Sequence, residues 1–115
     1  MSESISVIEL TDNGLHQQVL PGEPKTCGMR SGRVYLEPEE DCGIHNTRDN
    51  EEMLIFLNGR GVAVIGKERN QIPVGEGKVS YIPPETIHNI KNTGTGPLVY
   101  IYCVSPVADR AIVNK

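Results

Sequence analysis

The sequence contains no tryptophan and one phenylalanine, and aromatic residues make up only 4% of its 115 positions. It has no apolar run near the ~18 residues that a membrane-spanning helix needs. Its first residues lack the basic and apolar segments of a secretory signal. Its 11 Lys and Arg residues are scattered and are outnumbered by 15 Asp and Glu residues, so no basic patch is available for nucleic acid. These absences predict a cytoplasmic protein with no membrane or nucleic-acid partner.

Cysteine is also scarce, with three residues at Cys27, Cys42 and Cys103. An odd number without a CxxC pair predicts free thiols in a reducing compartment. Cys42 lies three positions before His45, and side chains on a strand alternate between faces. Unless a turn intervenes, we therefore expect Cys42 to face away from His45, which argues against a Cys-His metal site.

Turn-forming residues are plentiful, with 12 glycines and 8 prolines, and no segment shows a sustained helical period with caps. Short apolar segments between these turns predict strands at residues 5–10, 16–20, 34–37, 53–57, 62 onward, 72–74, 79–82, 86–90 and 98–104. Residues 28–32 are predicted as a turn, and the tail to residue 115 as one helical turn. The pattern predicts an all-β sandwich or barrel, with residues 1–115 as a single domain.

The central stretch contains two apolar segments separated by Asn58-Gly59, which predicts a β-hairpin because both residues tolerate positive φ. Two predicted strands, residues 53–57 and 98–104, are apolar at consecutive positions and therefore on both faces. A small barrel covers only the inner face of a strand. The outer face needs a second layer or another subunit, so we expect a homodimer.

Two histidines and a carboxylate lie on or beside these predicted strands. Glu51 and Glu52 are adjacent, so only one of them faces the interior, and alternation alone does not choose between them. A single histidine such as His45 or His88 is more often a hydrogen-bonded surface or core residue than a ligand. His16 lies outside any pattern and is predicted to be such an ordinary residue.

The spacing of these residues resembles the cupin superfamily over about residues 34–106. The first cupin motif contains a glycine, two histidines one residue apart, a glutamate and a final glycine. At that spacing this chain has Glu39, His45, Thr47, Glu52 and Gly59, so Glu39 replaces the first glycine and Thr47 the second histidine.

The second cupin motif contains a glycine, a proline, an inner glycine, a histidine and an asparagine. Here the corresponding residues are Gly77, Pro83, Glu85, His88 and Asn92, with Glu85 in place of the inner glycine. The resemblance implies a double-stranded β-helix, or jelly-roll barrel. The glycine replacements leave open whether those turns keep their usual conformation.

The resemblance further implies a divalent transition metal on His45, Glu52 and His88, with Thr47 at the position of a missing fourth ligand. Two imidazoles and one carboxylate suit iron, manganese, nickel or zinc, and the sequence does not select among them. The alternative is a barrel without metal, whose polar residues bond to one another.

Two functions follow from the resemblance. One is a metalloenzyme of dioxygenase, isomerase or lyase type acting on a small polar molecule inside the barrel. The other is a non-catalytic module that binds a metal or a small ligand. Tyr35, Tyr81 and Tyr102 are candidate catalytic or cavity-lining donors, or else ordinary strand aromatics.

Overall fold

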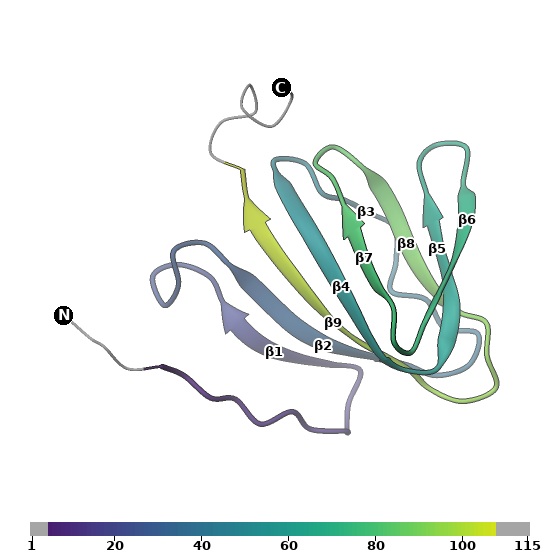
Figure 1. Ribbon diagram of the computed structural model, residues 1–115, viewed down its shortest axis with the longest axis horizontal. Helices are drawn as coiled ribbons and strands as arrows, with labels where there is room; N and C mark the ends of the chain where they lie inside the picture. The colour runs from purple at the N-terminus through teal and green to yellow at the C-terminus, as the bar shows by residue number, and fades with distance from the viewer. Residues whose placement is uncertain (1–4, 108–115) are drawn as a thin grey trace.

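The computed structural model describes residues 5–107, and this part of the chain contains no helix long and apolar enough to cross a membrane. It forms strands throughout (Figure 1). The strands are β1 (His16–Pro21), β2 (Arg30–Leu36), β3 (His45–Asn46), β4 (Asn50–Asn58), β5 (Arg60–Ile65), β6 (Asn70–Gly75), β7 (Val79–Ile82), β8 (Ile87–Asn92) and β9 (Leu98–Pro106).

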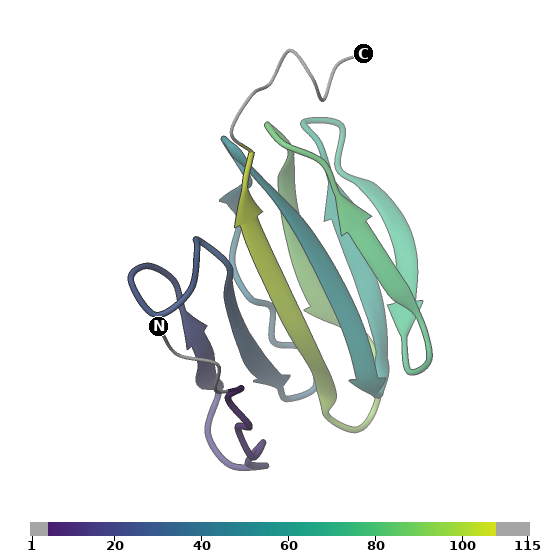
Figure 2. The ribbon, with the colours of Figure 1, turned by 60° about the vertical axis from the view of Figure 1, so that its left-hand side comes forward.

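The strands form two antiparallel sheets, one in the order β1-β2-β9-β4-β7 and the other in the order β3-β8-β5-β6. Figure 2 shows the sheets as two layers, with the long strands β9 and β4 in the front layer. The prediction of an all-β jelly roll is confirmed. The three cysteines are free thiols, as expected.

The apolar core fills one half of the space between the sheets. Leu36, Phe56 and Leu98 are fully or almost fully buried there, and the rings of Phe56 and Tyr100 lie 5.2 Å apart. Further along the same strands, the inward positions become polar. On β4, Glu52 lies two residues before Leu54 and therefore on the same face. On β8, His88 likewise lies two residues before Ile90. The core therefore closes one half of the barrel and leaves polar side chains in the other half.

The predicted hairpin at Asn58-Gly59 is wrong. β4 pairs with β7 and β9, whereas β5 pairs with β6 and β8, so the two strands lie in different sheets. Gly59 has φ +84° and alone connects them, and a Cβ there would collide with the carbonyl oxygen of Pro97. Asn58 donates its side-chain amide to that same oxygen at 3.1 Å. The positive-φ residue was correctly located, but it carries the chain across the barrel rather than back along the same sheet.

Two local predictions near the N-terminus are also wrong. Residues 5–10 are extended but form no strand, and Ile5 and Val7 are 85% and 87% exposed. Their alternation satisfies the strand pattern, but no neighbouring strand supplies backbone partners. Residues 30–32, predicted as part of a turn, belong to β2. The helical turn predicted for the tail lies outside the described residues.

The glutamates that replace two motif glycines keep a left-handed backbone. Glu39 has φ 75° and Glu85 has φ 56°. A side chain in this region costs about 1–2 kcal/mol relative to a right-handed conformation. The two turns therefore keep a conformation that glycine would adopt freely, and the turn at Glu85 still leads the chain into β8 and His88.

Candidate functional site

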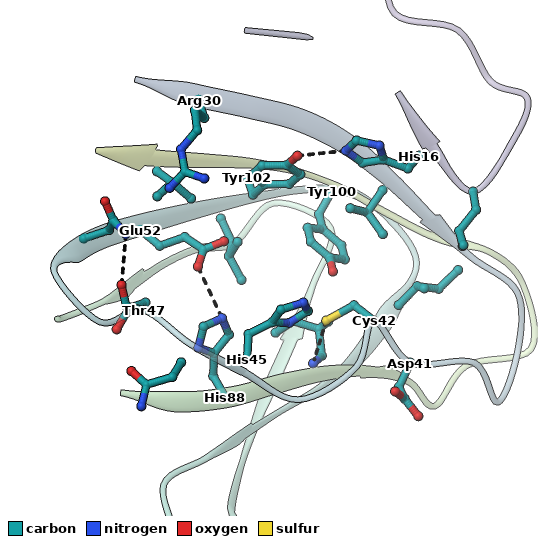
Figure 3. A pocket seen from close by; sticks show the side chains of 18 residues that line it. His16, Arg30, Asp41, Cys42, His45, Thr47, Glu52, His88, Tyr100 and Tyr102 are labelled. Carbon is teal, nitrogen blue, oxygen red and sulfur yellow. Dashed lines mark hydrogen bonds and ion pairs between the residues drawn. The ribbon is translucent and has the colours of Figure 1, made fainter. Parts of the chain in front are cut away.

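The polar half of the barrel encloses a pocket of about 510 Å³, a size suited to a small-molecule ligand (Figure 3). Its walls come from both sheets. The polar residues among those that line it are His16, Arg30, Asp41, Cys42, His45, Asn46, Thr47, Asn50, Glu52, His88, Tyr100 and Tyr102.

His88 and Glu52 meet across the pocket from opposite sheets. Nε2 of His88 lies 3.2 Å from Oε1 of Glu52, and both side chains are largely buried. The other ring nitrogen of His88, Nδ1, lies 3.1 Å from the carbonyl oxygen of Thr86. That carbonyl orients the imidazole so that Nε2 points to the carboxylate, which is how proteins commonly hold a ligating histidine.

His45 lies beside His88 on the same wall. The two residues are paired across β3 and β8, and their ring centroids are 5.9 Å apart. His45 is exposed at the pocket, whereas His88 is 5% exposed. The short strand β3 therefore brings the first predicted ligand next to the other two.

These three side chains fit a metal in donor chemistry but are not gathered around one point. Within residues 5–107, no group of three His, Cys, Asp or Glu side chains is close enough to hold a metal ion. Two ligands at ~2.1 Å from one ion, on neighbouring octahedral positions, lie about 3.0 Å apart. The 3.2 Å between His88 and Glu52 is close to that spacing. His45, the third predicted ligand, is the exposed member of the set.

In the metal-free protein, the charge on His88 depends on the groups around it. Burial lowers the pKa of His88, but the hydrogen bond to Glu52, the Thr86 carbonyl and the Glu52 charge together raise it above its ordinary value of 6.5. Glu52 therefore stabilises the protonated form of His88 in the metal-free protein. A metal that binds here must displace that proton.

Thr47, at the position of the missing fourth ligand, has its hydroxyl engaged elsewhere. The side chain is 5% exposed, and its Oγ1 donates to the carbonyl oxygen of Pro83 at 2.7 Å. The same oxygen accepts the backbone N–H of Thr86 at 2.9 Å. Thr47 thus ties the end of β3 to the turn before β8 and binds Thr86, the residue whose carbonyl orients His88.

The structure separates the two adjacent glutamates. Glu52 lines the pocket, whereas Glu51 faces outward and accepts a hydrogen bond from the hydroxyl of Tyr81 at 2.8 Å. Of the three candidate tyrosines, Tyr102 lines the pocket. Tyr81 is 59% exposed on the surface, and Tyr35 lines a separate hollow with Arg33 and Leu57. Tyr35 and Tyr81 are therefore not brought to the site.

Cys42 lies in the pocket wall, contrary to the expectation that it faces away from His45. Residues 42–44 are not part of a strand, and Gly43 has φ 94°, so strand alternation does not apply between Cys42 and His45. The Cys42 thiol accepts the Ile90 backbone N–H and lies 3.5 Å from Oδ1 of Asn89. Burial raises the pKa of this thiol, which therefore stays protonated near neutral pH.

Sequence reasoning missed the contribution of β1 and β2 to the pocket. His16 and Arg30 line it, and Nε2 of His16 lies 2.8 Å from the hydroxyl oxygen of Tyr102. His16 stands outside the motifs, and only the register of β1 on β2 brings it to the cavity. Of the residues on this wall, the sequence analysis had named Tyr102 as a candidate cavity-lining donor.

The sequence matches the family model described as Cupin domain over residues 32–105. It is 35% identical over 63 residues to an uncharacterized protein of Methanocaldococcus jannaschii, covering 55% of this chain and 49% of that one. It is also 35% identical over 61 residues to a glucose-6-phosphate isomerase of Pyrococcus horikoshii, covering 50% of this chain and 32% of that enzyme. The matches thus span half or less of the length of these relatives.

Among solved structures, a Cupin 2 conserved barrel domain protein of Salinispora arenicola superposes with a TM-score of 0.74. The superposition covers 97% of this chain and 95% of that protein at 19% identity. At this identity the likeness concerns the fold alone.

Proposed function

Because the chain belongs to the cupin domain family, we propose that its pocket binds a divalent transition metal through His45, Glu52 and His88. The observation that carries the proposal is the 3.2 Å approach of Nε2 of His88 to Oε1 of Glu52 inside a pocket of about 510 Å³. His45 on the neighbouring strand completes two imidazoles and one carboxylate, a set that leaves coordination positions for a substrate.

The bound metal would supply Lewis-acid or redox chemistry to a small polar molecule. The chain's own residues would orient that molecule and exchange protons with it. Burial raises the pKa of both Tyr102 and Tyr100, with smaller contributions from neighbouring groups, so both phenols stay protonated donors near neutral pH. The apolar residues Leu36, Leu54 and Ile90 form the floor of the pocket and would limit access of water from that side.

We propose a metalloenzyme of dioxygenase, isomerase or lyase type rather than a specific reaction. The match to a glucose-6-phosphate isomerase includes a third of that enzyme, and it supports testing sugar phosphates without establishing them as substrates. The competing proposal is a non-catalytic module that binds a metal or small ligand. Turnover of sugar phosphates, hydroxy acids or diketones would favour the enzyme, and saturable binding of such molecules without turnover would favour the module.

The ligands are tested by metal analysis of purified variants. We expect His45→Ala, Glu52→Ala and His88→Ala each to lose stoichiometric metal while the strand spectrum by circular dichroism is retained. Glu51→Ala is the matched control, because it removes the adjacent carboxylate, which faces away from the pocket toward Tyr81. Stoichiometric metal in folded His88→Ala, or equal loss in Glu51→Ala, would refute the assignment.

A further inference from the structure

The pocket carries a second group of polar side chains, which the proposed metal ligands do not use. They lie on β1, β2 and β9 of the five-stranded sheet, whereas His45 and His88 lie on the other sheet. Figure 3 shows His16 and Tyr102 facing each other along one side of the pocket, with Arg30 beyond them on the same side. The group therefore lies across the pocket from His45 and His88, on the sheet that also carries Glu52.

The histidine and the tyrosine form a fixed pair. Their rings are stacked with centroids 5.8 Å apart and planes 11° apart, and the hydroxyl of Tyr102 lies 2.8 Å from Nε2 of His16. One proton is shared in this contact. When Nε2 of His16 donates it, the Tyr102 hydroxyl is free to donate its own proton to a ligand.

A glycine makes room for the pair. Gly32 lies directly opposite Tyr102 in the pairing of β2 with β9. A Cβ at this position would lie 2.6 Å from the Tyr102 hydroxyl and 2.7 Å from Nε2 of His16. Its φ is not in the left-handed region, so the conformation does not demand glycine. What the position requires is the absence of a side chain, which lets His16 and Tyr102 meet across the strand.

Arg30 adds a positive charge that has no acidic partner in the described part of the chain. Its side chain is exposed, and no described carboxylate lies within 4.0 Å of it. It lies two residues before Gly32, so it faces the same side of β2. The guanidinium is close enough to oppose the rise in the Tyr102 pKa that burial causes. A charged group and a phenol donor thus share one end of the pocket.

We propose that Arg30, Tyr102 and His16 form a subsite for an anionic oxygen group, a carboxylate or a phosphate, of the ligand that enters this pocket. Arginine pairs with such groups through two parallel N–H donors, and the phenol supplies a further donor in a site partly removed from water. Glu52 repels an anion, so the anionic end is held at the arginine and the remainder of the ligand points toward Glu52 and His88. The subsite deepens the function proposed above, but it requires no metal to bind.

The test is a titration of metal-free protein with inorganic phosphate and, separately, with succinate at constant ionic strength, followed by amide chemical shifts. We expect saturable shifts at Gly32 and Tyr102 with one or both anions. Saturation by phosphate alone assigns a phosphate group, and saturation by succinate alone assigns a carboxylate. Shifts confined to residues outside the pocket, or no saturation with either anion, would overturn the proposal.

Variants then assign the contacts. Arg30→Gln should raise the dissociation constant of the anion at least 10-fold, and Tyr102→Phe should raise it about 5-fold. Arg69→Gln is the matched control, since Arg69 is an exposed arginine in the turn between β5 and β6. Because Arg30 is exposed, we expect Arg30→Gln to fold even where Tyr102→Phe does not. An affinity of Arg30→Gln for the anion within 2-fold of wild type would overturn the proposal.

The outcome of the anion titration can be distinguished from the outcome of the metal analysis. The anion titration uses metal-free wild-type protein, because none of Arg30, Tyr102 and His16 is a proposed metal ligand. Anion binding that depends on Arg30 in a protein that never takes up metal would end the metal proposal and leave the subsite standing. Stoichiometric metal with no anion binding would do the reverse.

Discussion

Removing the Thr47 hydroxyl should destabilise the protein, because this hydroxyl joins the residue after β3 to the turn before β8. Its Oγ1 donates to the Pro83 carbonyl at 2.7 Å and accepts the Thr86 N–H at 2.9 Å. Thr47→Val keeps the shape of the side chain but loses both bonds. Each such bond contributes about 1 kcal/mol net, so the free energy of unfolding should fall by about 2 kcal/mol. For a chain of 115 residues this lowers Tm by about 8 °C.

Thermal unfolding followed by circular dichroism measures this loss. Thr47→Ser is the control, because it keeps the hydroxyl and removes only the methyl group, and we expect it to lose less than half as much stability as Thr47→Val. Thr47→His would remove the same bridge, so any metal ligand that it adds comes with a loss of fold stability. A Tm for Thr47→Val within 2 °C of wild type would show that the hydroxyl does not hold the turn before His88.

Two further predictions concern the buried pair and the outer sheet face. In metal-free protein, Glu52→Gln should lower the pKa of His88, measured by NMR titration of the imidazole, because it removes two of the three contributions that raise it while burial remains. Since that pKa is raised in the folded state, the pair stabilises metal-free protein fully below about pH 6.5 and loses this contribution as pH rises through the folded pKa. Glu52→Gln should remove this stabilisation at low pH, and an unchanged His88 pKa would contradict the pairing. We also expect a homodimer, because Met53, Leu57, Val79 and Tyr81 are 40–63% exposed on the outer face of the five-stranded sheet. Light scattering at micromolar concentration should give about twice 12.6 kDa, and a mass near 12.6 kDa would refute the dimer.

The sequence predicted well those features that depend on neighbouring residues. The segment 79–82 is β7 to the residue, and the segments predicted at 16–20, 72–74 and 98–104 lie within β1, β6 and β9. Alternation also predicted that only one of Glu51 and Glu52 would enter the cavity. Which of them enters depends on the register of β4 against β7 and β9, and in that register Glu52 pairs with Ile82 and Val104, 30 and 52 residues further along the chain.

Features that depend on distant pairing were missed. The Asn58-Gly59 pair gives a strong local hairpin signal, but the decision between a hairpin and a crossover depends on contacts of Gly59 with Pro97 and Leu98. Cys42 was misplaced for a related reason. Counting by two holds only within a strand, and Gly43 with φ 94° takes the chain out of strand geometry between Cys42 and His45.

The glycines show why the second wall of the pocket escaped prediction. At Glu39 and Glu85 the motif expects glycine, and the chain keeps the positive φ without it. At Gly32 no motif expects glycine, and the φ is ordinary, but a side chain would collide with His16 and Tyr102. These two residues are 86 positions apart and meet only because β1 and β9 flank β2. A glycine that serves turn conformation can be recognised locally, whereas one that makes room between distant side chains is apparent only after the sheet is assembled. The residues that would hold a ligand's anionic end belong to this second kind, and their chemistry depends on the fold as much as on their type.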